Sequence, residues 1–118
     1  MKTQKELEFI FAEAKAIIRK FLGEGTDLFL NKSFATFLSN KDLRSCTASS
    51  IIGTLIYCAK VDLTPCNIIG DVFVYTSVDP VNATLQAYPV LGYKGVNKLI
   101  MRTGKVSVIN AEIGRAHV

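Results

Sequence analysis

The spacing of apolar residues changes near residue 70, and this change limits the possible fold more than any other feature of the chain. Before it, apolar residues recur at three- and four-residue intervals, the period of an α-helix that buries one face. This period predicts three helices, over residues 3–22, over residues 27–39, and over a segment that Ser45 or Thr47 can cap and that ends before Pro65. The first part of the chain is therefore expected to be helical.

The pattern after residue 70 is typical of strands. β-Branched and aromatic residues fill Val72–Thr76 and Ala83–Tyr88, and the segment between them, 77–82, has the composition of a hairpin loop. Pro89 has no amide hydrogen to donate to a neighbouring strand. The second strand is therefore expected to end at Pro89 or to lie at the edge of a sheet.

A further helix and a further strand are predicted after the hairpin. Helical spacing returns over Gly92–Thr103, where Gly104 occupies the position favoured for a C-cap, and Val106–Ala111 alternates as a strand does. The predicted fold class is therefore α+β, with N-terminal helices, a β-hairpin, a basic helix and a further strand.

The excess positive charge of the chain falls in one segment. The net charge is +4, yet residues 1–79 hold nine basic and nine acidic residues. Residues 80–111 hold Lys94, Lys98, Arg102 and Lys105 and no acid. Such an asymmetry indicates a polyanion as partner.

Three of these cations share one face of the predicted helix. At about 100° per residue, Lys94, Lys98 and Arg102 project within about 80° of one another, and Lys105 can join the same edge. Like charges at this spacing repel by a few tenths of a kcal/mol per pair, and no acid in the segment relieves them. A row of phosphates would do so. The alternative, a solvated helix face without a ligand, stays open.

The start of the same helix adds a second feature. Gly92, Tyr93, Lys94 and Gly95 place free backbone amides at a helix N-terminus, which suits an anion. Tyr93 and Tyr88 can stack on bases, although Tyr93 is also explained as a half-buried packing residue. The candidate DNA-binding residues are Gly92, Tyr93, Lys94, Gly95, Lys98, Arg102 and Lys105.

The residues that catalysis or a cofactor would need are not assembled in this sequence. The one Gly-Lys step, at residues 104–105, is followed by Val106 and does not fit a nucleotide-hydrolysis loop. The single histidine is His117, and the three widely spaced cysteines cannot supply a zinc site. No apolar run approaches the ~20 residues of a membrane helix. We expect a cytoplasmic protein with reduced cysteines that is not an enzyme and has no cofactor or metal.

Four motifs between Cys46 and Ala111 resemble the core of the RecT family of phage recombination proteins. They are the helix at residues 49–63, SSIIGTLIYCAKVDL; the Pro65 and Gly70 that introduce the hairpin; LGYKG at 91–95, which resembles IGYKG or IGYRG; and LIMRTG at 99–104, which resembles LARRSG. There are departures: Asp71-Val72-Phe73 stands where HAY is usual, and Met101 occupies the first position of the usual arginine pair.

The resemblance implies a function. Proteins of this family anneal complementary single strands in phage-type homologous recombination without ATP. The resemblance thus implies single-stranded DNA and the annealed duplex intermediate as partners. It also implies a homo-oligomer, either ring or filament, and a phage exonuclease that supplies single strands, in a bacterial or phage-infected cell.

The resemblance also suggests how the chain is organised. We expect an N-terminal helical region at 1–43, a RecT-like DNA-binding core at 44–111 and a non-native tail at 112–118, because the tail matches what a common sequencing adapter encodes in frame. Family members continue past the equivalent of Ala111, so the chain is expected to be truncated. The alternative function is a self-assembly module of a recombination complex, with DNA binding mainly in the missing C-terminal part.

Overall fold

The computed structural model describes residues 1–68 and 70–103 and has the predicted α+β architecture. Its elements in order are α1 (Gln4–Leu22), the short 3-10 helix η1 (Gly23–Gly25), α2 (Thr26–Leu38), α3 (Lys41–Arg44), α4 (Ala48–Val61), β1 (Val72–Asp79), β2 (Thr84–Leu91) and α5 (Tyr93–Thr103). The three predicted N-terminal helices are confirmed as α1, α2 and α4. The four-residue helix α3 was not predicted.

Local side chains start the two longest helices. Thr3 and Glu6 form a reciprocal capping box at α1, in which Thr3 Oγ1 accepts from the Glu6 amide at 3.2 Å and the Glu6 carboxylate accepts from the Thr3 amide at 3.3 Å. Thr47 caps α4 by accepting from the Ser50 amide at 3.3 Å. Each cap satisfies amides that the first helical turn leaves without a partner, so both helices begin where the sequence indicates.

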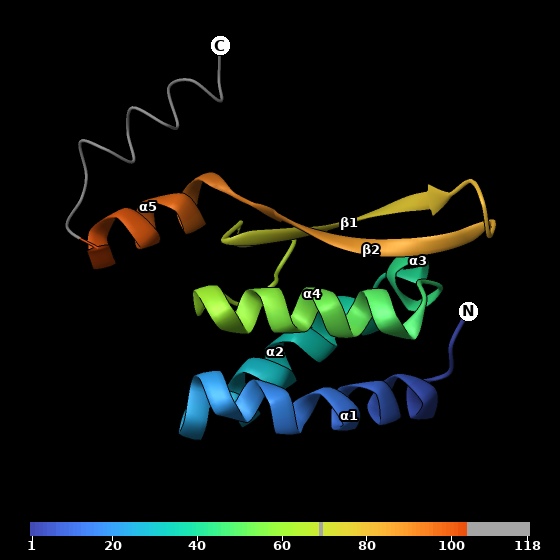
Figure 1. Cartoon of the computed structure of the whole chain (residues 1–118), viewed down its shortest axis with the longest axis horizontal. Helices are drawn as coiled ribbons and strands as arrows, with labels where there is room; N and C mark the ends of the chain where they lie inside the picture. The colour runs from blue at the N-terminus through green and yellow to red at the C-terminus, as the bar shows by residue number, and fades with distance from the viewer. Residues whose placement is uncertain (69, 104–118) are drawn as a thin grey trace, which may run out of the picture.

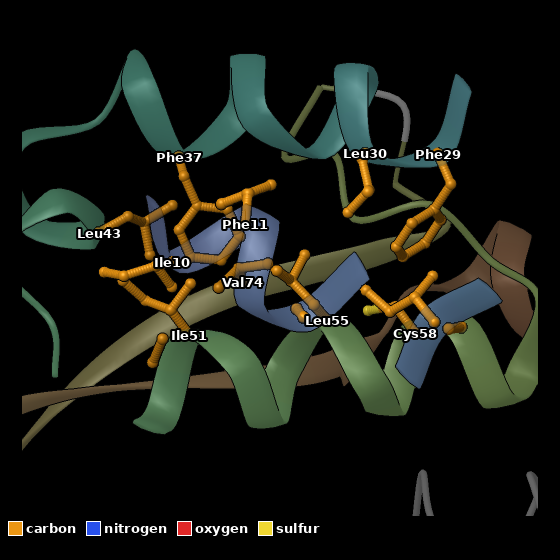
Figure 2. Packing of buried hydrophobic residues seen from close by; sticks show 14 of the residues in the cluster. Ile10, Phe11, Phe29, Leu30, Phe37, Leu43, Ile51, Leu55, Cys58 and Val74 are labelled. Carbon is orange, nitrogen blue, oxygen red and sulfur yellow. The ribbon is translucent and has the colours of Figure 1, made fainter. Parts of the chain in front are cut away.

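The helices and the hairpin share one hydrophobic core (Figures 1 and 2). The hairpin lies over α4, and α1 and α2 lie on the other side of α4. Figure 2 shows Phe11, Phe37, Leu55 and Val74 pointing toward one another from α1, α2, α4 and β1. The rings of Phe11 and Phe37 meet edge to face at 5.7 Å between centroids. The core therefore contains residues from both the predicted N-terminal region (1–43) and the predicted DNA-binding core (44–111). The division of the chain into these two regions stays a prediction.

The hairpin is longer than the sequence indicated. β1 runs to Asp79 and β2 begins at Thr84, so the loop is residues 80–83 rather than 77–82. The Asp79 carboxylate accepts from the Val81 amide at 2.9 Å and from Asn82 Nδ2 at 3.0 Å, and Ala83 takes a left-handed backbone with φ 54°. Hydrogen bonds from an aspartate to the next residues stabilise a tight turn, which lets both strands extend further.

Pro89 lies inside β2 and does not end it. It is paired with Val74 across the hairpin. The Val74 amide and carbonyl are hydrogen-bonded to the Asn67 side chain, at 2.8 and 3.1 Å, on the side away from β2. Val74 and Pro89 are therefore a non-hydrogen-bonded pair, in which the backbone N and C=O of both residues point away from the other strand. The missing amide hydrogen of Pro89 thus costs no hydrogen bond between β1 and β2. The edge position expected for Pro89 is what makes it tolerable there.

Several predicted features lie outside the described residues. These are the Gly104 C-cap, Lys105, the strand at 106–111 and the tail at 112–118. Within the described residues, no helix is both long enough and apolar enough to span a membrane.

Candidate nucleic-acid interface

Two glycines let α5 approach the backbone that precedes β1. A Cβ on Gly92 would lie 1.9 Å from the Gly70 carbonyl oxygen, and a Cβ on Gly95 would lie 2.0 Å from the Asp71 carbonyl oxygen. The Gly92 amide donates to the Asp71 carbonyl at 3.0 Å. These glycines therefore fix the position of α5 against residues 70–71 by close packing, a role that the sequence did not indicate.

Lys98 is paired with a buried acid. Its Nζ lies 2.5 Å from Asp71 Oδ2, and the Asp71 side chain is only 9% exposed whereas that of Lys98 is 52% exposed. Among the described residues, Asp71 Oδ1 has no hydrogen-bond partner. A buried carboxylate needs a cation nearby, so Lys98 compensates Asp71 as well as facing solvent.

Arg102 binds the C-terminal end of α4. Its Nη1 donates to the Val61 carbonyl at 2.9 Å and its Nη2 to the Asp62 carbonyl at 3.0 Å, with Asp62 Oδ2 at 4.0 Å. The last carbonyls of a helix lack intrahelical partners and carry partial negative charge. A guanidinium placed there satisfies two of them at once, and so ties α5 to α4.

Lys94 and Tyr93 differ from these two cations. Both side chains are exposed, Tyr93 to 71%, and Lys94 has no ion pair with any residue in the described part of the chain. The amides of residues 93–95 form the first turn of α5 and have no partner within the helix. The exposed position of Tyr93 does not support its interpretation as a half-buried packing residue.

The expectation of a row of uncompensated cations on α5 is therefore corrected. Lys98 and Arg102 each have a carboxylate partner, Asp71 and Asp62, and the Gly92 amide is already occupied. These acids lie in earlier parts of the chain, 27 and 40 residues from their partners, so a charge tally over residues 80–111 could not include them. Of the cations of this segment that the structure describes, Lys94 is the one without a carboxylate partner.

A cavity of about 680 Å³ opens beside the Lys98–Asp71 pair. The C-terminal half of α2 and the segment before β1 line it, including Lys32, Cys66 and Asn67. Its size falls in the range of about 300–1,000 Å³ that small-molecule sites span, and Asp71, whose Oδ1 has no hydrogen-bond partner among the described residues, is one of the residues that line it. Neither the cavity nor Asp71 was predicted from the sequence.

The three cysteines are free. Cys46 and Cys58 are buried, and burial raises the pKa of the Cys58 thiol from 9.0 to about 12. No group of three or more histidine, cysteine, aspartate or glutamate side chains within the described ranges could hold a metal ion.

Comparison with known proteins then identifies the family. The sequence model of the RecT family matches residues 27–118, more than three quarters of the chain. The chain belongs to the RecT family. No curated protein and no solved structure matches it. The recognition made from the LGYKG and LIMRTG motifs is thereby confirmed.

Membership in the RecT family sets the general function. The family consists of proteins of phage single-strand annealing recombination, which bind single-stranded DNA. In this chain the family's GYKG element is Gly92 and the first turn of α5, with its two glycines packed on residues 70–71 and its lysine exposed. The motif thus combines a packing role with an exposed cation.

Proposed function

We propose that this chain holds single-stranded DNA along α5 so that it anneals to a complementary strand without ATP. The proposed contacts are Tyr93, Lys94 and the first-turn amides, with Lys98, Arg102 and Lys105 beyond them. The observation that carries the proposal is the exposed Lys94 at the N-terminal turn of a helix whose other two described cations anchor it. A phosphate at that turn would meet one full charge and the partial charge of the helix.

Lys98 and Arg102 offer a phosphate less than a full positive charge each, because each already has a carboxylate partner. The Lys98 ammonium has three donors, and the Asp71 carboxylate takes one of them. The Arg102 side chain is 45% exposed with Nη1 and Nη2 engaged, which leaves Nε and the outer hydrogens for a phosphate. Both residues can therefore contact DNA while they keep α5 in place.

Contact with the backbone suits annealing. Phosphate contacts position a strand of any sequence and leave the base edges free to pair with a second strand. The nucleotide-hydrolysis motif that an ATP-dependent reaction would use was not found in the sequence. We propose that the chain binds two forms of DNA, the single strand before annealing and the annealed duplex that is the product.

Self-assembly is the second candidate function. Large apolar side chains are exposed on the helical side, with Phe9 of α1 at 66% and Leu28 of α2 at 61%. Exposed apolar residues of this size are common at subunit contacts. In a ring or filament, such contacts would lie between copies of the chain. A phage exonuclease is the proposed supplier of the single strands. Light scattering with and without an oligonucleotide separates assembly from DNA retention.

The test is an annealing assay with two complementary dye-labelled oligonucleotides and no nucleotide present. The chain is expected to accelerate annealing, and Lys94→Ala is expected to lower the rate. Lys5→Ala is the matched control because it removes the same charge from an exposed position on α1. No acceleration by the unaltered chain, or equal rates for Lys94→Ala and Lys5→Ala, would overturn the proposal.

A further inference from the structure

An aromatic series covers one face of the hairpin. The Tyr88 and Tyr75 rings lie 6.1 Å apart across the strands, and the Tyr75 and Phe73 rings lie 6.1 Å apart along β1 and are stacked at 27°. Tyr75 is 48% exposed and Tyr88 is 40% exposed. Alternation along the strands places Val72, Val74 and Ala87 on the opposite, buried face over α4 (Figure 1).

The series ends at the first turn of α5. The Phe73 ring lies close to Gly92, since a Cβ there would be 2.9 Å from Phe73 Cε2. Tyr93 and Lys94 follow Gly92 directly. An extended strand of DNA that reaches Lys94 can therefore continue over Phe73, Tyr75 and Tyr88.

We propose that this face is a stacking surface for the unpaired bases of single-stranded nucleic acid. The inference rests on the proposed function and deepens it, because it assigns the bases of the same bound strand to Tyr75 and Tyr88. Every base has a π-face, so aromatic stacking holds any sequence. It also leaves the pairing edges of the bases free, as annealing requires.

The composition and size of the face favour bases over a protein partner. Between Phe73 and Ser77 on β1 and between Gln86 and Val90 on β2, this face carries no charge that would repel phosphates. Asp79 follows on the same alternation, but it lies at the loop end and bonds to loop residues 81 and 82. A face two strands wide and five residues long covers roughly 170 Å² at strand spacings of about 5 Å and rises of about 3.3 Å. A stable protein interface needs about 800 Å² from each partner.

The experiment compares two oligonucleotides of equal length, one of thymidines and one of abasic residues, which carry the same phosphates. Binding is followed by the fluorescence anisotropy of a dye on each oligonucleotide, because the variants below remove two of the four tyrosines of the chain. The unaltered chain is expected to bind the thymidine strand about tenfold or more tightly than the abasic strand. Tyr75→Leu/Tyr88→Leu is expected to remove this preference, and Tyr75→Phe/Tyr88→Phe to keep it.

Tyr57→Leu on α4 is the matched control, since it removes a tyrosine of 37% exposure that does not belong to the aromatic series of the hairpin. Far-ultraviolet circular dichroism checks that each variant is folded. Equal binding of the two strands by the unaltered chain, or a preference that survives Tyr75→Leu/Tyr88→Leu, overturns the stacking surface and leaves the proposed function standing. Binding of neither strand overturns both. A change of oligomeric state in the leucine variant, without loss of the preference, identifies the face as a protein contact and also overturns the proposal.

Discussion

The helical layers and α5 are held in the molecule by different kinds of contact. The helices α1, α2 and α4 interlock through buried side chains such as Phe37 and Leu55, both 0% exposed. In α5, Ile100 is buried and Leu99 packs against the core, but polar contacts also position the helix: the Gly92 amide just before it bonds to Asp71, Lys98 pairs with the Asp71 carboxylate, and Arg102 bonds to the end of α4. Lys98 and Arg102 thus help to hold α5 against its neighbours, whereas buried apolar side chains hold α1, α2 and α4 together.

This difference shows how the basic residues of one helix can both anchor it and remain available to DNA. A cation at the surface can lie against solvent or DNA, whereas an apolar anchor must be covered. Using Lys98 and Arg102 as anchors keeps α5 in place without covering its outer side. The cost is that two of its three described charges are partly neutralised by Asp71 and Asp62.

Phe37→Ala tests the helical side of the comparison and is expected to have the largest effect. The ring is fully buried, so its removal leaves a cavity and should lower the free energy of unfolding by about 3–5 kcal/mol. Urea denaturation followed by circular dichroism measures this change. Phe9→Ala, at a position 66% exposed on α1, should change it by less than about 0.5 kcal/mol. Similar losses in the two variants would show that the core does not lie where we describe it.

Gly95→Ala tests the packing of α5. The new methyl group would lie 2.0 Å from the Asp71 carbonyl oxygen, so α5 must shift, at a cost of about 1–3 kcal/mol. Hydrogen exchange should accelerate in α5 and much less in α1. Gly53→Ala is the matched control in α4, where the methyl group meets nothing within 4 Å and should stabilise the helix by about 0.5–1 kcal/mol. Unchanged exchange in α5 of Gly95→Ala would contradict the close approach.

Raising the pH tests the burial of Cys58. Its pKa is raised from 9.0 to about 12, so its stabilising contribution is complete below pH 9 and is lost as the pH rises toward 12. By pH 10 the unfolded thiol is mostly ionised, and the free energy of unfolding should fall by about 1.4 kcal/mol from this group. Urea denaturation should show a shallower decline for Cys58→Ala, whereas Cys66→Ala keeps Cys58 and its decline. Equal declines in Cys58→Ala and the unaltered chain would argue against a buried Cys58.

Arg102→Ala should have a smaller effect on stability. It removes two hydrogen bonds to the end of α4, and because the side chain is 45% exposed we expect a loss of about 0.5–1.5 kcal/mol. Arg102→Lys keeps the charge but cannot span both carbonyls with one compact ammonium, so it should recover only part of the loss. Thermal denaturation of the three chains decides this. Full recovery with lysine would show that charge, rather than the guanidinium fork, ties α5 to α4.

Much of the fold was accessible from the sequence because local rules decide it. Thr3 and Thr47 cap their helices, the apolar period selects the buried faces, and Pro65 follows α4 at a short distance. The hairpin was also predictable, but its length was not. The turn around Asp79 and the Asn67 contacts to Val74 depend on side-chain hydrogen bonds that no periodicity reveals.

The candidate site was predicted less completely. The sequence located α5 and its cations, but the partners of Lys98 and Arg102 come from distant positions that only the fold brings together. Similarly, Tyr88 was recognised as a possible stacking residue, whereas Tyr75 was not, because their pairing depends on the register of the hairpin. Pairwise contacts between distant residues are what a single sequence fails to indicate.

The salt dependence of single-strand binding by Lys94→Ala tests the central claim most directly, that Lys94 is the α5 cation left free for phosphate. Each single-strand phosphate neutralised contributes about 0.7 to the slope of log affinity against log salt. Lys94→Ala should therefore flatten the slope by about 0.7 while the free energy of unfolding stays within about 0.5 kcal/mol of the unaltered chain. A slope equal to that of the unaltered chain would contradict the account.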